Sequence, residues 1–212
     1  MAGPIGAWEL DDLPVRIHRD ALRADPRLGR IAKHFRGIMA ALGLDLEDPN
    51  LVGTDQRVAR MYLEIFAGLE EGAEPSVTTF PNDQGYNQMV VVKDIPFYSM
   101  CAHHFLPFFG RAHVGYVPAG QVVGLSKLAR IVEFYARRPQ VQERMTEQVI
   151  QFLEKKLRPL GSIVVIEATH FCMEMRGVEK PGATTTTSAI RGVFLERPAR
   201  AEFFELIRRR AE

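Results

Sequence analysis

The first third of the chain has a helical pattern of apolar positions. From Leu28 apolar residues recur at helical spacing as far as Leu42, where Gly43 ends the pattern. A second helix is expected to begin at Thr54, a residue suited to the N-cap. The two predicted stripes are Ile31, Phe35, Ile38, Met39 and Leu42, then Val58, Met61, Tyr62, Ile65, Phe66 and Leu69. Residues 1–15 lack periodicity and are expected to form a loose arm.

The pattern then changes to short β-branched runs, which predict a sheet. The first two runs are residues 77–80 and 89–92, separated by a turn rich in Asn, Asp and Gly. Residues 110–117, followed by Pro118 to Gly120, predict a hairpin. Residues 163–166 predict a buried strand, and residues 184–194 are also prone to form strands.

Helical spacing returns at two places after the first strands and again at the end of the chain. Ser126 is expected to cap a third helix, and a fourth begins near Gln142 and Glu143. A short surface helix is predicted to end at residues 208–210, three arginines that suit a helix C-terminus. Strands followed by a helical pair favour an α+β fold, with an antiparallel sheet and helices on one face.

Composition limits the possible partners and compartments. The chain has 212 residues, 46% of them hydrophobic, and a net charge of +1, which gives no general reason to expect a nucleic acid or membrane partner. No apolar run approaches a membrane span, and the N-terminus lacks a signal pattern. A cytoplasmic protein is therefore expected. In a reducing compartment, both of its cysteines are available as thiolates.

Five side chains in two distant segments are candidate metal ligands. Cys101, His103 and His104 lie between an apolar strand and an aromatic run, and His170 and Cys172 follow the predicted strand at 163–166. Zinc takes thiolate and imidazole ligands, and three protein ligands leave a position open for water. Alternation in an extended segment predicts that His170 and Cys172 share a face. A disulfide, or two buried cysteines without a metal, remains the alternative.

Basic side chains are candidates for binding an anion. Lys127 and Arg130 project near the start of the third helix, where the helix dipole also favours an anion. Arg57 and Arg60 share a face of the second helix and could bind a phosphate, although the residues alone favour a solvated basic surface for this pair. His113 lies within a predicted strand and is expected to be structural.

Several long motifs in fixed order resemble the GTP cyclohydrolase I family, over residues 54–194. They are residues 124–130 (GLSKLAR), 138–144 (RPQVQER), the Cys-x-His-His and His-x-Cys segments, 175–177 (MRG) and 186–188 (TTS). The resemblance implies a zinc site formed by Cys101, His104 and Cys172, with His103 and His170 serving the chemistry. It implies that Glu143 anchors guanine, with Gln142 and Ser126 as further substrate contacts, and that Lys127, Arg130 and Arg176 bind the triphosphate. Arg57 and Arg60 are weaker correspondences.

The resemblance also implies an activity and an assembly. The expected reaction is zinc-dependent hydrolysis of GTP at C8, with formate release and rearrangement to 7,8-dihydroneopterin triphosphate. The implied architecture is a tunnelling fold over residues 76–212 with an arm and helical extension at 1–75, in a homodecamer of two pentamers with sites between subunits. Ala102 departs from the family's usual glutamate. This departure keeps open a homologue with a variant pterin product, and a structural-zinc protein is the other alternative.

Overall fold

The computed structural model describes residues 25–208, which form two compact units that divide between Ala73 and Glu74. The predicted loose arm at residues 1–15 and the last two of the three terminal arginines lie outside the described residues. Each unit is described by itself below. No helix in the described part of the chain combines the length and the apolar character needed to cross a membrane.

The first unit contains a pair of helices, α2 (Arg27–Ala41) and α3 (Thr54–Ile65), followed by the short helix η2 (Ala67–Leu69). Gly43 has φ 74°, a left-handed conformation that favours glycine, and it follows the end of α2 as predicted. Thr54 is not the N-cap of α3. That position is Gly53, also at φ 74°, and the Thr54 hydroxyl instead accepts a hydrogen bond from Arg57.

The apolar stripes predicted for these helices are only partly buried. The buried residues of the pair are Ala32 and Met39 in α2 and Ala59 and Leu63 in α3. By contrast Ile38, Leu42, Met61 and Leu69 are exposed. Periodicity identified the helices correctly, but the predicted stripes include side chains that are exposed and omit Ala32, Ala59 and Leu63, which are buried.

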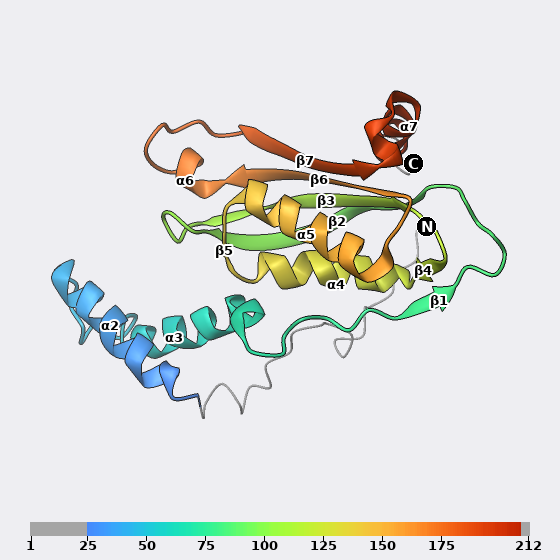
Figure 1. Ribbon diagram of the computed structural model, residues 1–212. Coiled ribbons are helices and arrows are strands. Elements are labelled where there is room, and N and C mark those ends of the chain that lie inside the picture. The colour runs from blue at the N-terminus through green and yellow to red at the C-terminus, as the bar shows by residue number, and fades with distance from the viewer. Residues whose placement is uncertain (1–24, 209–212) are drawn as a thin grey trace, which may run out of the picture. The chain divides into compact units, whose positions relative to one another are not determined.

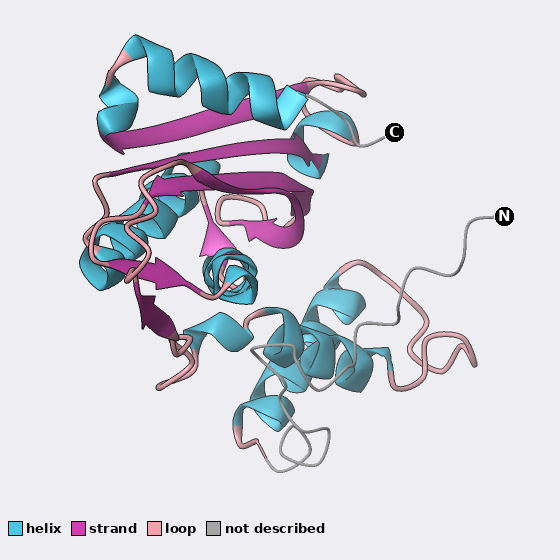
Figure 2. Cartoon of the chain, turned by 90° about the vertical axis from the view of Figure 1, so that its right-hand side faces the viewer, coloured by secondary structure: helices cyan, strands magenta, loops and turns pink. Residues whose placement is uncertain are grey.

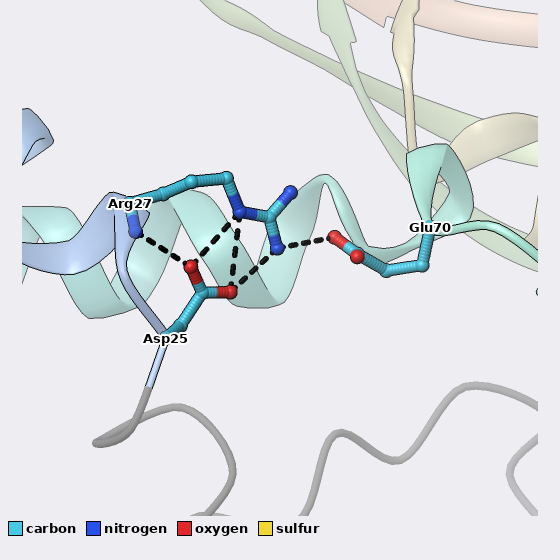
Figure 3. A network of polar contacts seen from close by, with 3 residues as sticks. All are labelled: Asp25, Arg27 and Glu70. Carbon is cyan, nitrogen blue, oxygen red and sulfur yellow. Dashed lines mark hydrogen bonds and ion pairs between the residues drawn. The ribbon is translucent and has the colours of Figure 1, made fainter.

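An ionic network joins the two ends of the first unit (Figure 3). The Arg27 guanidinium donates to Asp25 at 2.6 Å and to Glu70 at 2.7 Å, so one side chain connects the start of α2 to the residue that follows η2. The hydrogen bond from Arg27 lowers the pKa of Asp25, and both carboxylates raise the pKa of Arg27.

The second unit is built on a five-stranded sheet with the order β5-β2-β3-β6-β7 (Figure 1). The strands are β2 (Val90–Cys101), β3 (Pro107–Val117), β5 (Pro139–Gln140), β6 (Gly161–His170) and β7 (Thr184–Gly192). All neighbours pair antiparallel except β5, which pairs parallel with β2. The α+β class predicted from the sequence is confirmed.

The predicted hairpin after Gly110 is wrong in its pairing. The turn at Pro118 to Gly120 leads to β4 (Gln121–Val123), and β4 pairs with β1 (Thr79–Pro81) in a separate two-stranded sheet. Strand β3 pairs instead with β2 and β6. The hairpin that does form is β2–β3, and the Cys-x-His-His segment is its turn.

Helices α4 (Leu125–Ala136) and α5 (Gln142–Leu157) cover one face of this sheet. Their side chains Leu128, Ile131, Met145 and Val149 join Val164 and Ile166 of β6 in the main core. Ser126 is not the N-cap of α4, since the helix begins at Leu125 after Gly124.

The opposite face of the sheet also carries a helix. Ile163 and Val165 point away from the main core and pack with Phe203 of α7 (Arg197–Arg208) and with Phe194 of η3 (Val193–Leu195). Helix α7 is therefore more than the predicted surface helix, because it covers part of the second face (Figure 2). The rest of the unit comprises the one-turn helix α6 (Phe171–Glu174) and the loop from α6 to β7.

Candidate active site

The first group of candidate residues lies in the tight turn between β2 and β3. Cys101 ends β2, and its amide donates to the Leu106 carbonyl at 2.8 Å. Phe105 has φ 53° and donates to the Cys101 carbonyl at 2.9 Å, which closes the turn. Cys101 is buried, whereas His103 and His104 are exposed. The turn therefore fixes the backbone around one thiol and presents two imidazoles to solvent.

The second group is brought alongside by pairing of β3 with β6. Phe108 lies opposite His170 in this register. Two residues along β3, Gly110 permits very close strand approach, because a Cβ there would lie 1.9 Å from the Glu167 carbonyl oxygen. The prediction that His170 and Cys172 share a face of an extended segment is wrong, since β6 ends at His170 and Cys172 lies in helix α6. The Cys172 thiol is therefore positioned by the helical turn of α6 and not by the alternation of side chains along a strand.

Three side chains from these two segments form a potential metal site. Among residues 25–208, the group of mutually close donor atoms is Cys101 Sγ, His104 nitrogen and Cys172 Sγ, all within 4.8 Å of one another. The Cys101 Sγ lies 4.0 Å from His104 Nδ1. Tetrahedral zinc, with Zn–S ~2.3 Å and Zn–N ~2.0 Å, separates its ligands by about 3.5–3.8 Å. Small side-chain adjustments would therefore suffice for these three to hold zinc.

The electrostatics of the thiol pair also fit a cation. Both cysteines are free thiols. Burial raises the pKa of the Cys172 thiol, and the adjacent Cys101 thiol raises it further. Two neighbouring thiolates are mutually repulsive, and a divalent cation between them reverses this effect by stabilising both charges.

His170 lies beside this group and is held on two sides. Its ring stacks on Phe108 with centroids 4.6 Å apart and an interplanar angle of 2°. Its Nε2 lies 2.7 Å from Oε1 of Gln142. Burial lowers the pKa of His170, opposed by the charge of Glu143. His103 differs, because it is exposed and its Nδ1 lies 3.9 Å from Cys101 Sγ.

The predicted guanine contacts lie at the start of α5. The edge strand β5 pairs Gln140 with Cys101, so α5 begins beside the β2–β3 turn. Glu143 is exposed in the first turn of α5, where the helix dipole favours a carboxylate. Gln142 differs, because its side chain is buried and hydrogen-bonded within the protein.

The predicted phosphate-binding cations are more dispersed. Arg176 follows α6, is exposed, and lies close enough for its charge to act on Cys172. Ser126, Lys127 and Arg130 lie in the first half of α4, near the small β1–β4 sheet, while the other end of α4 leads to β5. Lys127 is nine residues before Ala136, about 14 Å along the helix axis.

Arg57 and Arg60 belong to the first unit. The Arg57 guanidinium donates to the Val52 carbonyl at 3.0 Å and to the Thr54 hydroxyl at 2.6 Å, while Arg60 is exposed. Sequence reasoning gave no role to Phe108, Thr146 or Thr187, although the aromatic run and the Thr-Thr-Ser motif were visible. Their importance depends on β3–β6 and α5–β7 contacts, which no local pattern identifies.

Comparison with known proteins gives consistent matches. The family model described as GTP cyclohydrolase I matches residues 31–208. A protein named GTP cyclohydrolase 1 from Pelotomaculum thermopropionicum is 52% identical over 184 residues, 86% of this chain and 97% of the relative. Proteins of that name from Mycolicibacterium gilvum and Halalkalibacterium halodurans are 54% and 55% identical, covering 82% and 81% of this chain and 88% and 92% of theirs. An archaeosine synthase QueF-Like structure gives a TM-score of only 0.40 at 18% identity, covering 49% of this chain and 93% of that one.

Proposed function

The chain belongs to the GTP cyclohydrolase I family of enzymes, and we propose that it hydrolyses GTP at C8, releases formate and rearranges the product to 7,8-dihydroneopterin triphosphate. This would be the first step of a pterin or folate pathway. The observation that carries the proposal is the meeting of Cys101, His104 and Cys172 beside an unligated, positioned His170. A structural zinc site would instead use four protein ligands.

Cys101, His104 and Cys172 would hold zinc. Zinc bound there would activate water for attack on C8 of guanine. The two thiolates and the imidazole match the ligand preference of this metal, and three ligands leave room for substrate chemistry.

His170 and His103 would manage the protons of the reaction. Ring opening, isomerisation of the ribose and closure of the new ring each move protons between carbon, nitrogen and oxygen. The half-buried, stacked ring of His170 would act at a fixed position. The exposed His103 would act from the turn, where its Nδ1 lies 3.9 Å from Cys101 Sγ.

Glu143 would recognise guanine. Its carboxylate has two acceptor oxygens, which match the adjacent N1–H and 2-amino donors of the base. Its exposure at the first turn of α5, one residue after the buried Gln142, supports this role, because the carboxylate is open to solvent and close enough for its charge to act on His170.

The cations would bind the triphosphate across a subunit boundary. Arg176 lies beside the thiol pair, whereas Ser126, Lys127 and Arg130 lie toward the far end of α4. This separation is the reason to propose that α4 of a second copy completes each site, and Arg57 and Arg60 are further candidates. The proposed assembly is a cytoplasmic homodecamer of two pentamers with the tunnelling fold. The sheet has β5 and β7 at its edges, and open edges favour pairing with another copy.

The experiment is incubation of the zinc-loaded protein with GTP, followed by assays for formate and for a fluorescent pterin after oxidation. Equal amounts of formate and 7,8-dihydroneopterin triphosphate are expected. A protein that binds zinc but releases no formate would refute the proposal.

Ala102 supports testing one second candidate, a variant pterin product. The Ala102 amide donates to the Gln140 carbonyl at 2.8 Å, so this position lies against β5 without the carboxylate usual in the family. The mass of the pterin product separates the two candidates.

A further inference from the structure

A polar cluster of two buried side chains and one half-buried side chain lies behind His170 and has no part in the reaction as proposed above. It consists of Gln142 and Thr146 of α5 and Thr187 of β7. Gln142 and Thr146 are each only 2% exposed. Thr187 belongs to the Thr-Thr-Ser motif at 186–188, which has no assigned role. Buried polar groups of this kind are costly unless their hydrogen bonds are satisfied, so their directions are informative.

The surroundings of Gln142 fix the orientation of its amide. Its Nε2 lies 3.0 Å from the Ile166 carbonyl, 3.0 Å from the Thr185 carbonyl and 3.1 Å from the Thr187 hydroxyl. Backbone carbonyls only accept hydrogen bonds, so the donating NH₂ group must lie on this side. The carbonyl Oε1 of Gln142 therefore faces His170.

The two threonines complete the pattern. Thr146 donates its hydroxyl proton to the backbone carbonyl of Gln142 at 2.8 Å. Its oxygen lies 2.7 Å from the Thr187 hydroxyl, so Thr187 must donate across this contact. A lone pair of Thr187 is then directed at Gln142 Nε2. The two protons of the Gln142 NH₂ group are therefore shared among three acceptors inside the protein, and its Oε1 lies against His170, so these contacts occupy both ends of the amide.

We propose that Thr187, acting through Gln142, is a positioning residue that holds His170 as the Nε2–H tautomer and leaves Nδ1 free to exchange a proton with the substrate. The contact of 2.7 Å between His170 Nε2 and Gln142 Oε1 requires a proton on Nε2, because Oε1 is an acceptor. The stack on Phe108 fixes the plane of the ring. The consequence for catalysis rests on the proposed function, whereas the tautomer does not. Gln142, predicted as a substrate contact, would act through His170.

The tautomer is tested without any substrate. Nitrogen-15 NMR of the zinc-loaded protein, labelled at histidine, distinguishes protonated from unprotonated ring nitrogens, and His170→Asn identifies the signals of His170. The wild-type protein is expected to show a protonated Nε2 and an unprotonated Nδ1. In Gln142→Met, which lacks the acceptor, both tautomers should be populated. A protonated Nδ1 in the wild-type protein would overturn the proposal. This test needs no Thr187 variant, so it decides the tautomer even if every Thr187 variant fails to fold.

Kinetics test the role of Thr187. Thr187→Val keeps the shape of the side chain and removes the hydroxyl, so kcat for formate release should fall about threefold to tenfold, the effect of one neutral hydrogen bond. KM for GTP should stay within about twofold, and Thr187→Ser should restore kcat. Thr186→Val is the matched control, because Thr186 is exposed on the opposite face of β7.

Three kinetic results would contradict the proposal. They are full activity in Thr187→Val, a change confined to KM, and an equal loss in the serine variant. Absence of formate from the wild-type protein would refute the proposed function instead, while the NMR assignment still decides the tautomer.

Discussion

The two halves of the candidate site are positioned in different ways. The turn half, Cys101, His103 and His104, carries exposed imidazoles, whose Nδ1 atoms lie 3.9 and 4.0 Å from the Cys101 thiol. In the strand half, His170 is stacked, hydrogen-bonded and backed by the buried Gln142 and Thr146 of α5 and the half-buried Thr187 of β7. The protein holds the ring of His170 by these contacts, whereas the turn half presents its imidazoles to solvent from a closed turn.

This difference suggests a division of labour. A metal site that is assembled partly by its ion can take up zinc by rotation of the exposed His104 side chain toward the two thiols. A proton-transfer group must already be in place, because small displacements reduce catalysis severely. The predictions below test this division, beginning with the largest expected effect.

Loss of any one proposed ligand should abolish metal binding. Cys101→Ala, His104→Ala and Cys172→Ala each leave two ligands, too few for a stable site, and formate release should fall more than about a hundredfold. His103→Ala should keep its zinc and lose activity only. Metal analysis of the four purified variants checks this. A His103 variant as poor in zinc as the Cys172 variant would mean that the turn half uses its other histidine.

Glu143→Gln should retain zinc and fold but lose affinity for GTP. The substitution replaces one acceptor with an NH₂ group that faces the donors of guanine, and a lost charge-assisted, two-point contact costs about 2–4 kcal/mol. Titration with a non-hydrolysable GTP analogue measures the loss. Glu143→Asp is the control that keeps the charge. Wild-type affinity in Glu143→Gln would remove this residue from the base pocket.

Removal of the metal should affect the two halves unequally. After treatment with a chelator, amide hydrogen exchange at residues 101–106 should become about tenfold faster or more, because the turn loses its ligand. Exchange at residues 166–170 should change little, since β6 is paired on both sides. Equal acceleration in both segments would contradict the division described above.

The sequence predicted the secondary-structure elements and the candidate metal ligands better than it predicted which elements contact one another. The α+β class and the helices α2 to α5 followed from periodicity, because a 3.6-residue repeat is a local signal. The helix caps at Thr54 and Ser126 were wrong, because Gly53 and Gly124 occupy those positions. The pairing of β4 with β1 rather than β3 was missed, because strand partners far apart in sequence leave no local signal.

The candidate site shows the same limit. The residue types and the motifs identified the Cys and His candidates, but the placement of Cys172 in a helix was not expected from the strand before it. The hydrogen bonds around Gln142 join α5, β6 and β7, so they become visible only when these three elements are in contact. Sequence resemblance gave that residue a role as a substrate contact, and the burial of its side chain is what suggests another.

The smallest predicted effect concerns His113, a histidine of β3 that lies outside the candidate metal group. It is 4% exposed, and its Nδ1 accepts from the Asp94 amide at 3.1 Å, beside the irregularity where Asp94 has φ 58°. Burial lowers the pKa of His113, partly opposed by Asp94 and Glu167 and reinforced by Arg111 and Lys93.

The sign of its pH dependence follows from proton binding. Below about pH 6.5 the unfolded chain takes up a proton at this histidine while the folded protein does not, so its contribution to stability is present above that pH and is lost as the pH falls toward the lowered pKa. His113→Asn keeps an acceptor near the Asp94 amide and cannot titrate. Its free energy of unfolding in urea should therefore fall less than that of the wild-type protein between about pH 7.5 and 5.5, by roughly 1 kcal/mol or less. Identical pH profiles would mean that His113 has the same pKa in both states, and that its burial does not keep it neutral.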